Sequence, residues 1–300
     1  MAVESSSSPP RLPVTLSSWL SSRANRTRIT LAVCYVIVIL GAVVVFFPFF
    51  WQLSTSLKAP RDVFRWPPVW FPIPPHFENY TEVATVVPIV RFVTNSLVIA
   101  SLVIVGTALS CSLAAYGFAR LRFPGRDVIF LVLISPMILP WSVYMVPQFI
   151  LFQKLGWYNT YLPLVVPAFF GNPFFIFLLR QFFLSIPLEL EDAARIDGAG
   201  FLGTYARVIL PLAKPGLATV VIFTFMWTWN DFFGPLIYLS NQKLFTLPLG
   251  LAFFQGSPRS TVQMHLLMAT SVIIVIPCIV IFFVAQRVFI QGIVFTGVKG

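Results

Sequence analysis

The ionisable side chains of this 300-residue chain gather in one interval, from Arg180 to Lys214. The interval holds eight of the thirty charged residues: Arg180, Glu189, Glu191, Asp192, Arg195, Asp197, Arg207 and Lys214. Good helix formers fill residues 188–195, which predicts a short helix. Its acidic residues come first, where the positive end of the helix dipole stabilises them. Their spacing therefore favours a charged surface helix.

Two glycines shape the segment after this helix. Gly198 and Gly200 predict its end and a sharp turn, because glycine adopts backbone angles that a Cβ opposes. A second helical piece is expected from about Phe201 to Val208, and two prolines then lead into the next apolar run. We call residues 185–215 the elbow, and predict that it is a helix–turn–helix segment on a membrane surface.

Other patterns that carry chemistry are absent from the sequence. No lysine follows a glycine, so there is no GKS or GKT phosphate-binding loop, and any ATP must be bound by another chain. His76 and His265 stand far apart without other metal ligands nearby, so we expect no metal site. The three cysteines all fall in apolar runs and are interpreted as small buried side chains. We therefore expect a chain that is not itself an enzyme.

The elbow resembles the EAA loop of the permeases of ABC importers, whose pattern is roughly EAAxxDGA followed by LPxxxP. The matching residues are Asp192-Ala193-Ala194, Asp197-Gly198-Ala199, Leu210-Pro211 and Pro215. The acid of the motif is Asp192 instead of Glu, and Glu191 precedes it. The whole segment 186–199, IPLELEDAARIDGA, is similar to the same segment in the carbohydrate-importer branch of the family, of the maltose and glycerol-phosphate type. The competing interpretation is an ordinary amphipathic loop.

The resemblance implies an assembly and a set of coupling residues. The assembly would contain a second, different permease, two ABC ATPase subunits that bind ATP and Mg, and an extracellular or periplasmic sugar-binding protein. The elbow would be seated in a groove of one ATPase and carry its motion to the membrane spans. The coupling residues would be Glu191, Asp192, Ala193, Ala194, Asp197 and Gly198. Alanines allow close approach to the groove, and Gly198 allows the turn.

The composition is that of a membrane protein. Of all residues 58% are hydrophobic and 10% are charged, whereas soluble domains average about 25% charged. Apart from Asp231 in the fifth, six stretches of 25 to 29 residues lack charges, and each is long enough for a helix that crosses a bilayer. We predict an all-α polytopic membrane protein with six transmembrane helices and a cytoplasmic coupling helix. Its net charge of +10 does not indicate nucleic acid, because the basic residues stand singly at the ends of apolar runs.

Charge asymmetry predicts the topology. Six spans place both termini on one side, and that side carries thirteen of the twenty lysines and arginines. The positive-inside rule then puts both termini and the elbow in the cytoplasm. The resemblance implies that the chain lies in the cytoplasmic membrane of a bacterium. Residues 1–28 are expected to form a cytoplasmic N-terminal tail and residues 29–300 the permease domain.

Prolines and polar residues interrupt several predicted spans. The third and fourth spans contain several prolines, and Gly171-Asn172-Pro173 interrupts the fourth. Such breaks either line a pathway or are packing kinks. The fifth span contains Trp227-Thr228-Trp229-Asn230-Asp231-Phe232-Phe233, which resembles the WNDF element of the family. Asp231 either contacts substrate, bonds to another helix or lies in water at the interface. The pathway candidates are Asn172, Trp227, Asn230 and Asp231.

Several connections keep two interpretations each. The turn from Arg120 to Arg126 resembles the AYGFAR…FPGR signature; its basic residues either set the orientation or touch a partner. The Pro- and Trp-rich loop after the first span is a stiff interfacial loop or a docking element. By position, residues 240–261 match the loop that faces the binding protein in maltose-type permeases, and the ending GVKG resembles a cytoplasmic tail.

The sequence leaves other functions open. The first alternative is an ABC permease for another solute, such as a polyol, glycerol phosphate or a peptide. The second is an ion-coupled secondary transporter, which needs several intramembrane charges for coupling. The third is a channel or receptor without an ATPase, which leaves the elbow unexplained.

Overall fold

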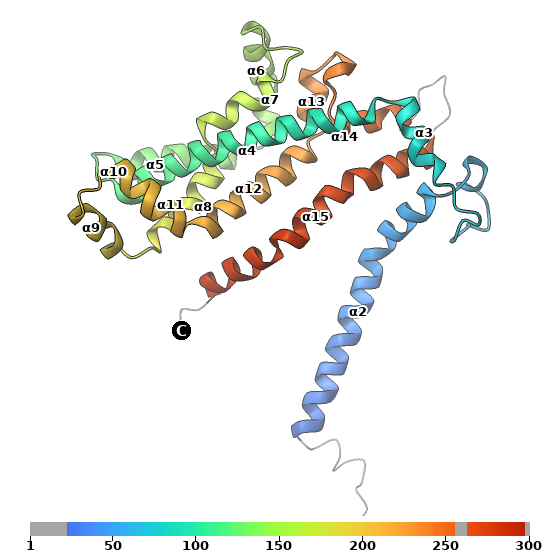
Figure 1. Ribbon diagram of the computed structural model, residues 1–300, viewed down its shortest axis with the longest axis horizontal. Helices are drawn as coiled ribbons and strands as arrows, with labels where there is room; N and C mark the ends of the chain where they lie inside the picture. The colour runs from blue at the N-terminus through green and yellow to red at the C-terminus, as the bar shows by residue number, and fades with distance from the viewer. Residues whose placement is uncertain (1–22, 256–262, 298–300) are drawn as a thin grey trace, which may run out of the picture. The chain divides into compact units, whose positions relative to one another are not determined.

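The computed structural model describes the backbone of residues 23–255 and 263–297, and every regular element in this part is helical (Figure 1). The α-helices are α2 (Arg23–Ser56), α3 (Glu78–Val86), α4 (Ile89–Arg120), α5 (Arg126–Ile134), α6 (Trp141–Lys154), α7 (Leu162–Val165), α8 (Pro173–Leu184), α9 (Glu189–Ile196), α10 (Phe201–Thr204), α11 (Leu210–Leu212), α12 (Lys214–Trp229), α13 (Phe233–Tyr238), α14 (Leu247–Gly250) and α15 (Met264–Gly297). The prediction of an all-α chain is confirmed.

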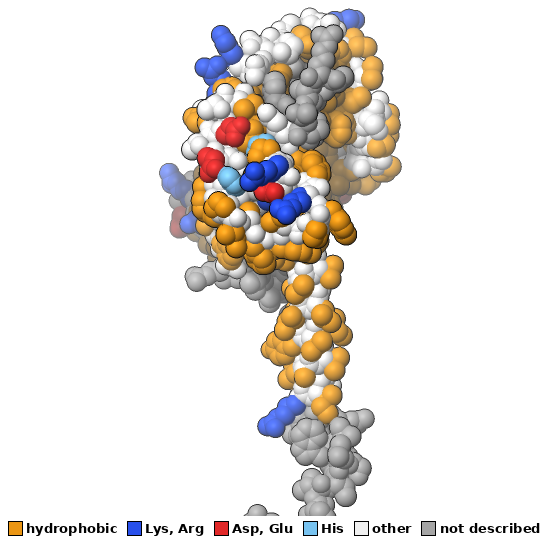
Figure 2. Space-filling model, turned by 90° about the vertical axis from the view of Figure 1, so that its right-hand side faces the viewer, with side chains coloured by type: hydrophobic (Ala, Val, Ile, Leu, Met, Phe, Trp, Pro, Cys, Tyr) orange, Lys and Arg blue, Asp and Glu red, His pale blue; other side chains and the backbone are white. Residues whose placement is uncertain are grey.

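The chain divides into two units, residues 1–54 and residues 55–300. In the first unit, α2 has apolar side chains that are exposed along the helix, as Figure 2 shows. A helix that is apolar all round suits lipid contact. Most of the predicted N-terminal tail, residues 1–28, lies outside the described residues. The same holds for residues 256–262, which include the end of the loop expected to face a binding protein, and for the last three residues of the predicted C-terminal tail.

By length and composition, four helical stretches are able to cross a membrane: Thr27–Ser56, Ile89–Arg120, Leu162–Leu184 and Met264–Gln286. Two bent helix pairs bring the number to as many as six. One pair joins Arg126–Ile138 to Trp141–Lys154 at 100°, and the other joins Phe201–Leu212 to Lys214–Trp229 at 78°. Four of the six predicted spans thus correspond to long helical stretches, and the third corresponds to the first bent pair. The predicted fifth span corresponds to α12 and α13, because Phe201–Leu212 of the second pair belongs to the elbow.

Proline and glycine explain the breaks in the third and fourth predicted spans. α6 begins directly after Pro140, whose extended backbone ends the preceding helical turn. In the fourth span, Gly171 has a φ of 91°, and Pro173 occupies the first turn of α8. A short 3₁₀ turn, Val166–Phe170, precedes this glycine. The break at Pro140 is therefore a change of helix direction, whereas the interruption at Gly171 lies within one continuous helical stretch, Leu162–Leu184.

α4 is the central helix of the second unit. It packs along both α8 and α12, and Figure 1 shows these three helices side by side. Two hydrophobic clusters lie at its two ends. One includes Tyr116, Leu179, Phe183 and Ile209, and the other includes Phe92, Trp229 and Leu247. α4 thus reaches from the elbow, at one end of the unit, to residues 239–255, which we call the far loop.

Candidate functional site

The first leg of the elbow is α9, and its end matches the sequence prediction. The helix covers Glu189–Ile196, with three acidic residues in its first turn and Arg195 in its last. Gly198 follows in the left-handed conformation with a φ of 85°. Its N–H donates to the carbonyl of Arg195 at 3.0 Å, and the N–H of Ala199 donates to that of Ala194 at 2.9 Å. A left-handed glycine thus closes the helix end.

Glu191 is buried inside the protein, although it belongs to a charged surface helix. Its side chain is 2% exposed and its Oε1 lies 2.7 Å from Nε of Arg120, whose side chain is 3% exposed. The contact is an ion pair without an aligned hydrogen bond, since neither of these two atoms has one. On its other side, Glu191 Oε2 lies 3.8 Å from Nη2 of Arg195, one helical turn further on. The elbow is therefore anchored through a buried carboxylate.

Arg120 joins three elements at one point. It is the last residue of α4, and its Nη2 donates to the carbonyl oxygens of Phe183 and Ile186, each at 2.6 Å. These two carbonyls belong to the end of α8 and to the link into α9, so one guanidinium holds α4, α8 and α9 together. The planar fork of arginine suits such a set of acceptors. The sequence suggests orientation or a partner contact for the basic residues of this turn, and neither interpretation describes this internal role.

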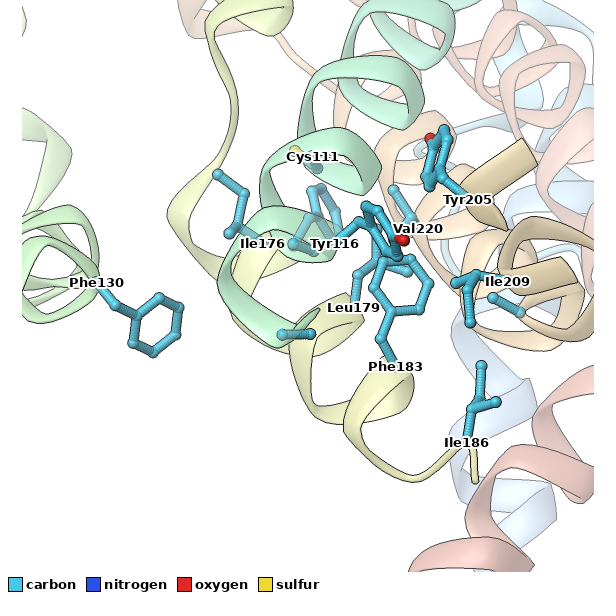
Figure 3. Packing of buried hydrophobic residues seen from close by; sticks show 14 residues of the cluster. Cys111, Tyr116, Phe130, Ile176, Leu179, Phe183, Ile186, Tyr205, Ile209 and Val220 are labelled. Atoms are coloured by element: carbon cyan, nitrogen blue, oxygen red, sulfur yellow. The ribbon is translucent and has the colours of Figure 1, made fainter. Parts of the chain in front are cut away.

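The second leg of the elbow is held to the same helix by a tyrosine. It runs through α10, a π-helical turn (Tyr205–Ile209) and α11. The hydroxyls of Tyr205 and Ser112 are 2.7 Å apart and buried, and the Tyr205 and Tyr116 rings lie 5.2 Å apart. Figure 3 shows Tyr205 and Ile209 beside Leu179, Phe183 and Val220. Both legs of the elbow are thus attached to α4.

The remaining coupling candidates lie on the exposed side of the elbow. Asp192, Ala193, Asp197 and Gly198 are exposed, and Ala194 is half-buried. Apolar side chains lie exposed in the same segment: Ile196 at 86% and Leu202 at 73%. Exposed apolar side chains of this kind are typical of a surface that contacts another protein or a membrane. The elbow thus has an anchored side, which carries Glu191, and a free side, which carries the other candidates.

The structure brings two of the pathway candidates near one another. Asn172 caps α8, because its Oδ1 accepts hydrogen bonds from the N–H groups of Phe174 (3.0 Å) and Phe175 (3.3 Å). The ring centroid of Trp227, on α12, lies 5.8 Å from that of Phe174 and 5.1 Å from that of Phe175. Trp227 is 52% exposed. One aromatic surface therefore extends from the break in the fourth span to α12.

The other two pathway candidates lie where α12 ends. Asn230 is exposed and its Nδ2 donates to the carbonyl of Met226 at 2.8 Å. Asp231 lies in the break between α12 and α13, and its Oδ1 accepts the N–H of Gly234 at 3.1 Å. Its carboxylate thus accepts a hydrogen bond from the backbone at the start of α13. No contact in the structure supports the interpretation that Asp231 binds substrate. The side chains of Trp227 and Asn230, by contrast, are exposed and are accessible to a solute.

We expect the role of Asp231 to be mainly structural, which a pair of substitutions tests. Asp231→Asn keeps an oxygen that accepts the Gly234 N–H, so assembly and transport should be retained. Asp231→Ala leaves that N–H without a partner and should destabilise the chain by about 1–3 kcal/mol. Gly234→Ala should behave like Asp231→Ala, because its Cβ would collide with the Asp231 carboxylate. Thermal unfolding and uptake are measured; loss of uptake in a stable Asp231→Asn variant would contradict this role.

Comparison with known proteins identifies the family. Residues 106–294 match the model of the binding-protein-dependent transport system inner membrane component. The chain belongs to this family. The match covers α4 from its middle onward, the elbow and most of α15. The chain is therefore a multi-pass permease of the inner membrane and the transport component of its system, not a catalytic subunit.

Individual relatives agree with this family. The permease is 33% identical to the diacetylchitobiose uptake permease NgcG of Streptomyces coelicolor, over 88% of this chain and 87% of that one. It is 31% identical to the trehalose/maltose permease MalG of Thermococcus litoralis, over 87% and 94%. It also matches a crystal structure of a bacterial ABC transporter for import of the polysaccharide alginate, with a TM-score of 0.79, 25% identity, and coverage of 89% and 98%.

The resemblance stated from the sequence is thus confirmed at the level of the family. The family assignment decides against an ion-coupled secondary transporter and against a channel without partners. Sequence reasoning missed Arg120, Ser112 and Tyr205, which hold the elbow in place. One signal was present, because Arg120 ends the AYGFAR segment and is the first charge after a stretch of 28 uncharged residues.

Proposed function

We propose that the permease translocates a sugar or short oligosaccharide that an external binding protein delivers. The support comes from relatives named for diacetylchitobiose, arabinooligosaccharides and trehalose/maltose. Other relatives are named for sulfoquinovosyl glycerol and sn-glycerol-3-phosphate, so a polyol or phosphate ester is the alternative solute. The half-exposed Trp227 next to Asn230 offers an aromatic face and an amide. Such groups stack on and hydrogen-bond to a sugar ring.

The single observation that carries the coupling role is the two-sided elbow. Its buried side is fixed to α4, and its exposed side presents Asp192, Ala193 and Ile196. A short helix fixed on one side transmits displacement, because it cannot rotate away from a force on the other side. We infer that this exposed side is seated in a groove of an ABC ATPase, which binds ATP and Mg on its own chain.

The proposed assembly has this permease, a different sister permease, two ATPase subunits and the binding protein. Both termini and the elbow face the cytoplasm, which the asymmetry of lysines and arginines supports. Closure of the ATPase dimer moves the elbow, and access to a cavity between the two permeases alternates between the two sides of the membrane.

Co-purification tests this assembly. The tagged permease is extracted gently from native membranes, and the proteins that accompany it are identified. We expect an ABC ATPase and a second permease. Gly198→Trp should lose the ATPase, because the ring adds bulk to the exposed turn. Gly156→Trp is the matched control, since Gly156 also has a positive φ (73°) and open space around it but follows α6, away from the elbow.

The solute is tested in the same preparation. Uptake of labelled maltooligosaccharides, chitooligosaccharides and glycerol phosphate is compared in vesicles that contain the complex and its binding protein. Uptake of a sugar supports the proposal, and uptake of glycerol phosphate alone supports the alternative. A permease that purifies without an ATPase from membranes that contain one would overturn the assembly.

A further inference from the structure

The far end of α4 holds the far loop in the same way that its near end holds the elbow. Nδ2 of Asn95 donates to the carbonyl oxygens of Lys243 and Phe245, both at 2.9 Å. One residue further, Oγ of Ser96 accepts the N–H of Leu247 at 2.8 Å. The buried ring of Phe92 lies against the backbone of Gly250, where a Cβ would collide with it. The far loop is therefore fixed to α4 by several polar and packing contacts.

α4 is also the longest of the described helices that contain no proline. It has 32 residues, about 48 Å at 1.5 Å per residue. Its sequence contains no proline, whereas α2 contains Pro48 and α15 contains Pro277. The stretch Leu162–Leu184 is interrupted at Gly171, and the two bent pairs turn by 78° and 100°. A helix without these breaks moves as one body.

We propose that α4 is the element that links the elbow to the far loop, with Arg120 and Asn95 as the positioning residues at its two ends. This inference rests on the proposed function, in which the elbow meets the ATPase. A displacement of the elbow passes through Arg120 and Tyr205 into α4, and Asn95 passes it to the far loop. In this proposal the far loop contacts the loaded binding protein, because residues 240–261 match by position the loop that faces the binding protein in maltose-type permeases.

The link acts in both directions, because coupling between two sites is reciprocal. Docking of the binding protein on the far loop biases the position of α4 and therefore of the elbow, which stimulates the ATPase. ATP binding biases the far loop and therefore changes the affinity for the binding protein. The chain order does not suggest this route, since the elbow is continuous with α8 and α12 and not with α4.

The reconstituted importer tests the link through two readouts. The first is the ratio of ATPase rates with and without solute-loaded binding protein. The second is the ratio of binding-protein affinities in the presence and absence of a non-hydrolysable ATP analogue. We expect Asn95→Ala to keep the basal ATPase rate and to lower both ratios by about fivefold or more, the size of typical couplings. Asn95→Asp, which keeps the size but lacks the donor, should act in the same direction.

Two controls separate the link from general loosening. Thr94→Val changes an exposed neighbour that bonds only to its own helix, at the Val90 carbonyl. Asn159→Gly releases the start of the far loop, because Asn159 Oδ1 accepts the N–H groups of Ser240 (3.1 Å) and Asn241 (2.9 Å), and this residue lies between α6 and α7 and not on α4. Glycine keeps the positive φ of 59° at this position. Both controls should retain both ratios.

The outcomes separate the role of α4 from the importer assignment. Unchanged ratios in both Asn95 variants, or equal losses in Asn159→Gly, overturn the role of α4 and leave the importer assignment intact. If both Asn95 variants lose the basal ATPase rate as well as the two ratios, Asn95 is required for folding or assembly, and the link is also overturned. A wild-type complex whose ATPase does not respond to any binding protein contradicts the proposed function itself.

Discussion

Arg120→Met is expected to be among the most disruptive single changes in this permease. It leaves the buried Glu191 carboxylate without its nearest cation and removes the donor from two carbonyl oxygens. Breaking a buried ion pair from one side lowers stability by about 3–5 kcal/mol. We expect a lower unfolding temperature of the purified permease and loss of the ATPase on co-purification. The measurement is thermal unfolding together with the amount of bound ATPase.

A cycle of variants shows whether the pair itself is responsible. Arg122→Met, which changes an exposed arginine two residues away, should have little effect. The double variant Arg120→Met with Glu191→Leu should recover part of the loss, because no charge stays buried alone. Arg120→Lys keeps a charge but not the guanidinium fork, and should fall between wild type and Arg120→Met. If Arg120→Met behaves like Arg122→Met, the anchoring role is wrong.

Gly198→Ala should reduce transport, while Gly200→Ala should not. Gly198 has a φ of 85°, where an L-residue is strained by about 1–2 kcal/mol, and Gly200 has an ordinary φ of −74°. A Cβ at either position meets no atom within 4 Å, so the difference reports the backbone alone. Uptake per ATP hydrolysed is the measurement, since a distorted turn transmits less motion. Gly198→Asn should be milder than Gly198→Ala, because asparagine tolerates this conformation.

Equal uptake per ATP in Gly198→Ala and Gly200→Ala would show that the left-handed turn has no part in coupling. Gly198→Trp adds bulk to the same turn and should uncouple the complex or prevent its assembly. Normal transport by Gly198→Trp with the ATPase retained would contradict the placement of this turn in the groove.

Local patterns in the sequence predicted the elbow well. Good helix formers with leading acids and a following glycine indicated α9 to within one residue, and Gly198 has the positive φ that its position required. These features depend on neighbours along the chain. The breaks near Pro140 and at Gly171-Asn172-Pro173 were equally local, since proline and glycine act on their own backbone.

The contacts that anchor the elbow were not predictable in this way. Arg120 and Glu191 are 71 positions apart, and their pairing depends on how α4 meets α9 in space. The same holds for the bond between Tyr205 and Ser112. Asp231 was interpreted as a carboxylate inside a span, and the structure places it in a break after Trp229. The hydropathy of a stretch does not show where its helix ends.

Site-specific photocrosslinking from the elbow tests the central claim most directly. A photoreactive residue replaces Ile196, which is 86% exposed on the elbow, or Ile73, which is 90% exposed in the loop before α3. The intact importer is then irradiated with and without ATP. We predict that the Ile196 position crosslinks to the ATPase with a yield that changes with ATP, and that the Ile73 position does not. An ATPase crosslink from Ile73 and none from Ile196 would contradict the claim that the elbow couples ATP hydrolysis to transport.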